Sequence, residues 1–518
     1  METLLANLFR LEAEGDIVGI NRFVVENRYN APKVFKALQY GFVTGRLRLA
    51  YILALILDSG GFRHFLISLG ISAGGIFYGK EAEERRGREM LYQQAASLSA
   101  AEQRLLHNTL SPVIAGLLVD MTNTALVVRI IEMVKAAVPT FRAIFDWHAP
   151  VPRLAWEKMR QRGREQAHLI DPPQPPADAL RVKRRVLIMI RQQRGNGLRF
   201  ASAMNSYGWD AEVSPLPLSD ATAAEDCRLI AEMCRQKKTD LLFFDANQLV
   251  TFARGMAAYR EMTAQLRQEN PGFRALGLFF DQSPDAKQST LEIMRETFDG
   301  VVSQLPLDSF IRRNPAFKVF DNRTMLHSFA SPVGDQNLGK ADQPLVPHLF
   351  FSGTICSGHW PRALWLGAIA HMGLPQKARV NAFSYDNPLF KQSPLDDYSA
   401  YVRGLAEATC CFSPLMLEGE NRYLTGRTFE VPLCGALLVQ EASPLTHYYF
   451  IPGEHFLEFS TISELVGVMQ FIKEHREEAE EIRRCGNAFA RERYNDARMV
   501  AHFDHFLYYA DRDRAAGG

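Results

Sequence analysis

Two patterns of apolar residues divide the chain. From residue 1 to about residue 165, apolar positions recur every three or four residues, which is typical of amphipathic helices. The clearest such stretches are 31–40, 83–96, 100–121 and 122–137. After about residue 183, short uninterrupted apolar runs alternate with helical stretches, as in parallel sheets that are buried on both faces. The pattern therefore predicts a helical region followed by α/β structure.

The first α/β stretch contains three strong strand candidates. They are RVLIMI at 185–190, DLLFFD at 240–245 and ALGLFF at 275–280, with shorter candidates at 300–303 and 317–320. Helices are expected at 198–207 and 223–236. Strands that alternate with helices predict a doubly wound parallel sheet.

A second α/β stretch begins near residue 349. Strands are expected at 349–354, 378–384, 410–414 and 436–440, and helices at 361–372, 393–408, 425–434 and 496–509. Two polar stretches that contain proline, 171–176 and 331–347, break the pattern and are typical of linkers. The predicted domains are a helical accessory domain (1–170), two Rossmann-like domains (183–332 and 345–495) and a terminal helix (496–518).

The segment 421–441 combines a basic residue, an acidic residue and a buried strand. Ligands of α/β sheets bind outside the carboxyl ends of the strands. The guanidinium of Arg427 suits a phosphate, and the carboxylate of Glu430 can accept hydrogen bonds from sugar hydroxyls. The alternative is an ion pair between these two residues within one helix. Thr425 and Gly426 precede them and would supply further donors.

Four segments together resemble the nucleotide-sugar half of GT-B glycosyltransferases, in the group 1-like branch that includes the spore-maturation-protein type. They are FFSGTICSGHWPRALWLGAI (350–369), TGRTFEVPLCGALLV (425–439), 450–472 and 481–503. The resemblance implies two Rossmann-like domains that face an active-site cleft, with the terminal helix packed back on the first of them. It also implies that a nucleoside-diphosphate sugar is bound by Gly353, Thr354, Arg362, Ser384, Tyr385, Thr425, Gly426, Arg427 and Glu430.

Many related retaining enzymes carry two glutamates separated by seven residues in this region. Glu430 matches the second glutamate, which binds the nucleotide ribose. The first, which contacts the donor sugar, falls on Arg422 in this chain. The resemblance therefore assigns a ribose role to Glu430 and leaves open whether the sugar configuration is retained or inverted.

Two carboxylates are candidates for the acceptor side. Asp245 and Asp281 directly follow apolar strands, and either can act as the base that takes a proton from the incoming hydroxyl. The alternative for each is a carboxylate that caps a helix or binds backbone. The loop 194–197 (RGNG) lacks a full G-x-G-x-x-G pattern and does not indicate NAD. Neither a metal nor a cofactor is expected from the resemblance.

Composition narrows the function classes further. The charges nearly cancel, at 59 basic and 58 acidic residues, which argues against a nucleic-acid partner. The seven cysteines form no paired metal motif, and the longest apolar run near the start, 49–57, is too short to span a bilayer. We expect a cytoplasmic protein, with peripheral membrane contact through the helical domain as an alternative.

The sequence thus predicts a glycosyltransferase that acts on a hydroxyl of a glycan, lipid-linked or protein acceptor in bacterial cell-surface or protein glycosylation. Two alternatives remain. One is an inactive GT-B scaffold that binds partners through residues 1–165, and the other is a sugar-nucleotide epimerase with the same fold.

Overall fold

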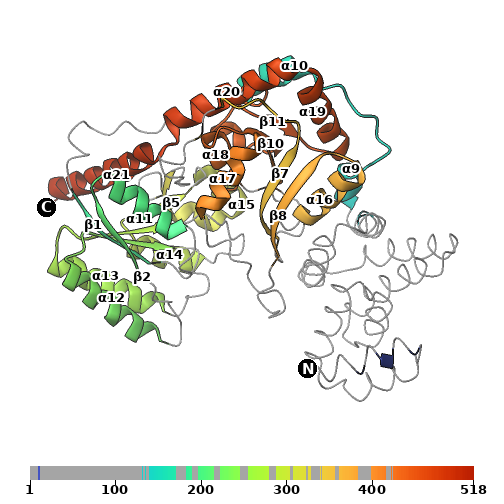
Figure 1. Cartoon of the computed structure of the whole chain (residues 1–518). Coiled ribbons are helices and arrows are strands. Elements are labelled where there is room, and N and C mark those ends of the chain that lie inside the picture. Colours follow the sequence, from blue (N-terminus) through green and yellow to red (C-terminus); the bar gives the residue numbers. More distant parts are fainter. Residues whose placement is uncertain are drawn as a thin grey trace.

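The computed structural model describes most of residues 139–517 (Figure 1). Before these it describes 7, 10, 11, 14, 131 and 135, and within them it omits 171–182, 190–195, 215–221, 246–254, 279–287, 304–306, 322–324, 328–338, 340, 356–360, 383–397, 416–421 and 423. The helices predicted between 31 and 137 lie outside the described residues, apart from Ile131 and Lys135, which are helical.

The first α/β unit is a six-stranded parallel sheet with the order β2-β1-β3-β4-β5-β6. Its strands are β1 (Arg185–Met189), β2 (Asp210–Ser214), β3 (Leu241–Asp245), β4 (Arg274–Leu278), β5 (Gly300–Ser303) and β6 (Met325–His327). Its helices are α11 (Asn196–Ser206), α12 (Ala223–Lys237), α13 (Met256–Glu269), α14 (Gln288–Thr297), α15 (Leu307–Arg313) and the 3-10 helix η4 (Pro315–Val319). Strand β2 lies on one side of β1, and β3 and the later strands lie on the other. The carboxyl ends of β1 and β3 therefore form a topological switch point.

Three details of this sheet differ from the prediction: the strand expected at 317–320, the edge strand β2, and the strand β6, which was not predicted either. The strand expected at 317–320 is wrong, because these residues belong to the 3-10 helix η4, where the side chain of Asn314 accepts from the Ala316 N–H. Strand β2 was not predicted. It lies at the edge of the sheet and mixes exposed residues (Asp210, Glu212) with buried ones (Ala211, Ser214), so it lacks the apolar run that marks the central strands.

The second unit is a five-stranded parallel sheet with the order β11-β10-β9-β7-β8. Its strands are β7 (Leu349–Ile355), β8 (Gln376–Ala382), β9 (Cys410–Ser413), β10 (Leu437–Glu441) and β11 (Leu457–Phe459). Its helices are α16 (Pro361–His371), α17 (Tyr398–Ala408), α18 (Arg427–Leu433), η7 (Thr446–Tyr448), α19 (Ile462–Glu474) and α20 (Arg476–Arg493), followed by α21 (Asp496–Gly517). Here the order reverses at β7, and the switch point lies between β7 and β9. Two doubly wound parallel sheets confirm the predicted GT-B fold class.

Helix α21 joins the two units. In Figure 1 it leaves the end of α20 and runs across to the first unit, where it lies near α11. Phe503 of α21 contacts Phe200 and Phe243 of the first unit, with ring centroids 6.3 Å and 5.4 Å apart. Beside these rings, Asp504 forms a buried ion pair with Arg184, at 3.3 Å. One buried apolar cluster includes side chains of both units, so the two sheets share part of their core.

The segment before the linker packs against the second unit. It contains α9 (Pro139–Ile144) and α10 (Trp156–Gln166). Phe145 lies edge-on to Trp365 of α16, at 4.8 Å between ring centroids, and Arg164 of α10 pairs with Glu454 at 2.5 Å. The described end of the expected helical domain therefore lies on the surface of the second unit.

A buried histidine gives the second unit a pH-dependent stability. Nδ1 of His455 accepts a hydrogen bond from the Ile451 N–H at 3.1 Å, and its ring stacks on Phe489 at 4.1 Å. Burial lowers the pKa of His455 to about 4, against an opposing effect of the Glu454 carboxylate. Because the pKa is lower in the folded state than in the unfolded chain, this stabilisation is complete above about pH 6.5 and is lost as the pH falls toward 4.

We expect His455→Asn to flatten this pH dependence. Asparagine offers an oxygen in place of Nδ1 and does not titrate. Between about pH 7 and pH 5, the wild-type protein should lose about 2 kcal/mol more of its unfolding free energy than the variant does. Denaturant unfolding of both proteins at the two pH values measures this difference, and parallel losses would show that His455 is not the group responsible.

Candidate active site

The switch point of the second unit holds a buried arginine. Arg427, the first residue of α18, donates from Nη1 to the carbonyl oxygen of Ser352 on β7, at 2.9 Å. Its guanidinium also lies over the ring of Phe351, 4.9 Å from the centroid. A Cβ atom on Gly353 would collide with Nη1, so glycine is needed for the arginine to cross the end of β7.

Most of the hydrogen-bonding capacity of Arg427 is unused. The residue is only 6% exposed, and its Nε and Nη2 atoms have no hydrogen-bond partner among the described residues. Burial lowers the pKa of Arg427, while nearby Tyr401 and Glu430 favour its charged form. A buried cation with free donors is costly for the fold unless a ligand satisfies it. Such an arrangement is typical of a site for an anion.

Buried hydroxyl groups accompany Arg427. The Oγ atoms of Ser352, in the middle of β7, and of Ser413, the last residue of β9, have no hydrogen-bond partner among the described residues, and neither has Oγ1 of Thr425. A hydroxyl can donate to a phosphate oxygen as well as accept a hydrogen bond. The sequence indicated Thr425 but not the two serines, which look like ordinary strand residues until the strand order brings their ends together.

Glu430 lies one turn after Arg427 and is 3% exposed. Its Oε1 accepts from Nη1 of Arg199, and its Oε2 accepts from the hydroxyl of Tyr401, both at 2.6 Å. The Arg427 side chain donates to Ser352 instead, and within the described residues it forms no ion pair with Glu430, so the alternative of an Arg427–Glu430 ion pair is not the arrangement found. Arg199 belongs to α11, which follows β1, and the two units therefore meet at Glu430.

Arg422 has a structural partner. Its Nε lies 3.1 Å from Oε1 of Glu441, which is fully buried at the end of β10. The other oxygen of Glu441 accepts from the Leu415 N–H at 2.8 Å. The position that carries the first glutamate in many related enzymes is therefore filled here by the cation of a partly buried ion pair.

The structure describes only some of the other predicted site residues. Gly426 directly precedes α18, and Arg362 is buried in the first turn of α16. Thr354 lies on β7 and Asp245 ends β3 at the switch point of the first unit, but neither side chain is described. Asp281, Ser384 and Tyr385 lie outside the described residues, as do Arg194 and Gly195 of the RGNG loop.

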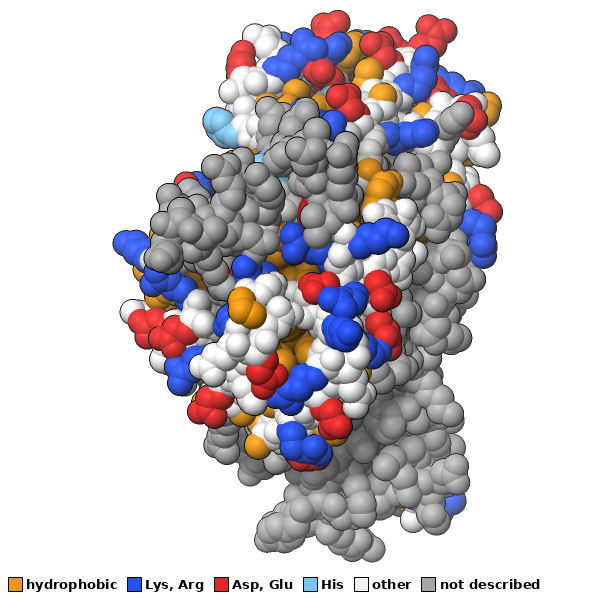
Figure 2. All heavy atoms as spheres, turned by 90° about the vertical axis from the view of Figure 1, so that its left-hand side faces the viewer, with side chains coloured by type: hydrophobic (Ala, Val, Ile, Leu, Met, Phe, Trp, Pro, Cys, Tyr) orange, Lys and Arg blue, Asp and Glu red, His pale blue; other side chains and the backbone are white. Residues whose placement is uncertain are grey.

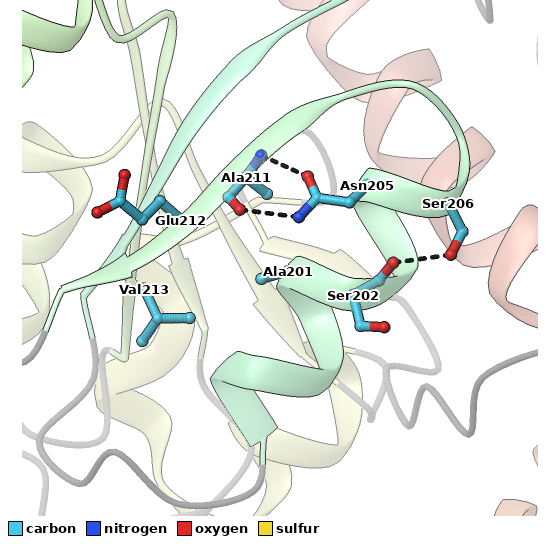
Figure 3. A pocket seen from close by; sticks show the side chains of 7 residues that line it. All are labelled: Ala201, Ser202, Asn205, Ser206, Ala211, Glu212 and Val213. Carbon is cyan, nitrogen blue, oxygen red and sulfur yellow. Dashed lines mark hydrogen bonds between the residues drawn. The ribbon is translucent and has the colours of Figure 1, made fainter.

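A surface hollow of about 750 Å³ between α11 and β2 is a poor candidate for the same chemistry (Figure 3). The amide of Asn205 is occupied there by the backbone of Ala211, in two hydrogen bonds of 2.6 Å and 3.0 Å. The single charged residue in its lining is Glu212, which pairs with Lys237. A carboxylate without a neighbouring free cation does not attract a phosphate.

On the face shown in Figure 2, basic and acidic side chains are interspersed over the coloured part of the molecule. Within the described residues we find neither a group of three or more side chains suited to a metal ion nor a helix long and apolar enough to cross a membrane.

Comparison with a family model identifies part of the chain. The model described as glycosyl transferase-like matches residues 374–504, which extend from just before β8 into α21 and include Arg427 and Glu430. The chain therefore carries a glycosyl transferase-like domain, which confirms the predicted enzyme class for this part. No curated protein matches the chain.

Several solved structures are similar to this chain, at low identity and low TM-score. Anabaena HepE in complex with UDP and glucose is 10% identical, with a TM-score of 0.43 over 63% of this chain and 100% of that one. A glycosyltransferase from Rickettsia africae is 11% identical, with a TM-score of 0.43 over 63% and 98%. Thermobaculum terrenum O-GlcNAc transferase is 14% identical, with a TM-score of 0.36 over 99% and 98%.

Proposed function

We propose that this protein transfers a sugar from a nucleoside-diphosphate sugar to a hydroxyl group of a glycan, lipid-linked or protein acceptor. The observation that carries the proposal is Arg427, a buried guanidinium with two free nitrogens at the switch point of the sheet. A diphosphate offers the planar, charged acceptors that such a group binds best. The family match over the same residues supports this assignment.

The proposed chemistry rests on stabilising the leaving group. When the bond between sugar and diphosphate breaks, negative charge grows on the diphosphate, and Arg427 would lie beside it in a site with little water. The buried hydroxyls of Ser352, Ser413 and Thr425 would add donors without adding charge. Gly353, Thr354, Gly426 and Arg362 remain proposed contacts of the donor, as do Ser384 and Tyr385.

Three carboxylates have proposed roles in binding the donor and activating the acceptor. Glu430 would accept hydrogen bonds from the ribose hydroxyls of the donor. Asp245 or Asp281 would remove the proton of the acceptor hydroxyl as it attacks the sugar. We further propose that the protein belongs to the spore-maturation-protein type, acts in the cytoplasm on bacterial surface or protein glycans, and needs neither a metal nor a cofactor.

One observation is compatible with the alternative of an inactive scaffold. Arg422 occupies the position of the first glutamate and is held by Glu441, so no carboxylate contacts the donor sugar from that position. Donor binding alone does not decide between the two functions, because a scaffold can retain it. Turnover of a bound sugar nucleotide, detected as release of the nucleoside diphosphate, separates them.

Donor binding should raise the stability of the protein. We expect one nucleotide among UDP, GDP, ADP, CMP and dTDP, at about 100 times its dissociation constant, to add about 2.7 kcal/mol to the free energy of unfolding. Thermal unfolding with each nucleotide measures the effect. Glu430→Ala, which removes the proposed ribose contact, is the control and should respond less than the wild type. No response to any of the five would contradict the proposed donor site.

A further inference from the structure

The carboxylate of Glu430, on α18, is contacted by side chains from two other helices, one in each unit. Tyr401 reaches it from α17 of the same unit, and Arg199 reaches it from α11 of the first unit, 231 residues away in sequence. Each carboxylate oxygen accepts one short hydrogen bond. The side chain of Arg199 is 17% exposed, whereas that of Glu430 is 4% exposed. In the absence of a ligand, the carboxylate is therefore covered and its oxygens are in use.

A ribose at this position needs the same oxygens. The 2′ and 3′ hydroxyls are adjacent donors, and a carboxylate binds such a pair with one hydroxyl to each oxygen. Because Glu430 is almost inaccessible to water, one of its present partners has to move before a ribose can reach it. Arg199 is the partner that can leave most readily, since it comes from the other unit and already contacts solvent.

We propose that Arg199 occupies the ribose subsite of the donor-free protein and that the donor displaces it. The inference rests on the proposed function, because it takes Glu430 as the ribose acceptor. Arg199 is then a residue that sets donor affinity: its bond to Glu430 links α11 of the first unit to α18 of the second, and the donor replaces that bond with its own hydroxyls.

This competition predicts that removal of Arg199 tightens nucleotide binding. With Arg199→Met, Glu430 no longer has to exchange a charge-assisted bond for bonds to ribose. We expect the variant to bind the nucleoside diphosphate found in the thermal panel about tenfold more tightly than the wild type. Titration calorimetry measures both affinities, and circular dichroism with a thermal melt checks that the variant is folded.

Two controls make the expected gain specific to the ribose. The 2′,3′-dideoxy form of the same nucleotide lacks the displacing hydroxyls and should bind wild type and Arg199→Met equally. Arg403→Met removes an arginine that is exposed on α17, two residues from Tyr401, and should leave ribonucleotide affinity unchanged. A gain that appears equally with the dideoxy nucleotide would overturn the proposal, because it would reflect a general loosening of the two units.

Failure of the inference and failure of the proposed function give different results. If the wild type binds a nucleotide and the folded Arg199→Met variant binds it with equal or lower affinity, Arg199 does not compete with ribose and this inference is wrong. If the wild type binds none of the nucleotides, the proposed function itself fails.

Discussion

Replacing Arg427 with methionine should lower the rate of sugar transfer at least about a hundredfold. Loss of one preorganised donor to a developing negative charge typically costs a factor of about 10² to 10³ in turnover. Arg427 has two free nitrogens and a backbone bond that fixes the third, so it is held ready for an anion before the donor arrives. The measurement is the initial rate of nucleoside-diphosphate release at saturating donor.

The same substitution should leave the fold intact. A buried guanidinium with unpaired donors destabilises the protein, and an apolar side chain of similar length removes that cost. We therefore expect the free energy of unfolding of Arg427→Met to equal or exceed that of the wild type. Arg427→Lys is the matched variant. It keeps the charge but loses the planar fork, and its turnover should lie between those of wild type and methionine.

A folded Arg427→Met variant with wild-type turnover would contradict the assignment of the diphosphate to this site. A variant that loses both stability and turnover would show instead that Arg427 is a structural residue. The free nitrogens make this second outcome unexpected, because apart from the bond to Ser352 the contacts of the guanidinium are with an aromatic ring and with nearby charges.

The strongly apolar strands were predictable because each is buried on both faces. RVLIMI and DLLFFD became β1 and β3, and the sequence located them to within one residue at each end. Edge strand β2 was not predictable in the same way, since exposed, half-buried and buried residues are mixed along it and it has no apolar run. At 317–320 an apolar composition favoured a strand, but the preceding Asn314-Pro315 pair starts a 3-10 turn.

The candidate site was predictable only where its parts are close in sequence. Arg427 and Glu430 fall in one short segment, and the resemblance to known enzymes drew attention to them. Arg199 was missed because its partner lies 231 residues further along the chain, and one sequence contains no signal for that pairing. Its position in the first helix after the first strand of a doubly wound unit was the available clue, since such helices begin at the switch point.

The departure from the glutamate pattern of related enzymes at Arg422 is also explained by a contact between residues that lie apart in the sequence. Arg422 stands where many related enzymes have a glutamate, and the structure shows that it pairs with the buried carboxylate of Glu441. Arg422 and the glutamate at the end of β10 therefore form one ion pair, although they lie 19 residues apart in the sequence.

Glu441→Ala should destabilise the protein by about 3–5 kcal/mol, the usual cost of breaking a buried pair from one side. The substitution leaves the Leu415 N–H without its acceptor and deprives Arg422 of its counter-ion. Glu441→Gln keeps an oxygen for Leu415 and should cost only about 1–3 kcal/mol. Denaturant unfolding of the variants gives the free energies, with the double variant Arg422→Met/Glu441→Ala expected to lose less than the sum of the losses of Arg422→Met and Glu441→Ala.

Arg422→Glu is the decisive variant of this series. It restores two glutamates at the spacing of related enzymes, but it also puts a second carboxylate beside the fully buried Glu441. Like charges at this distance repel strongly where little water screens them. We therefore expect Arg422→Glu to be less stable than Arg422→Met, and to regain stability when Glu441 is changed to Gln. An Arg422→Glu variant as stable as the wild type would mean that the position is free to hold a carboxylate, and that Arg422 is retained for a reason other than its pair with Glu441.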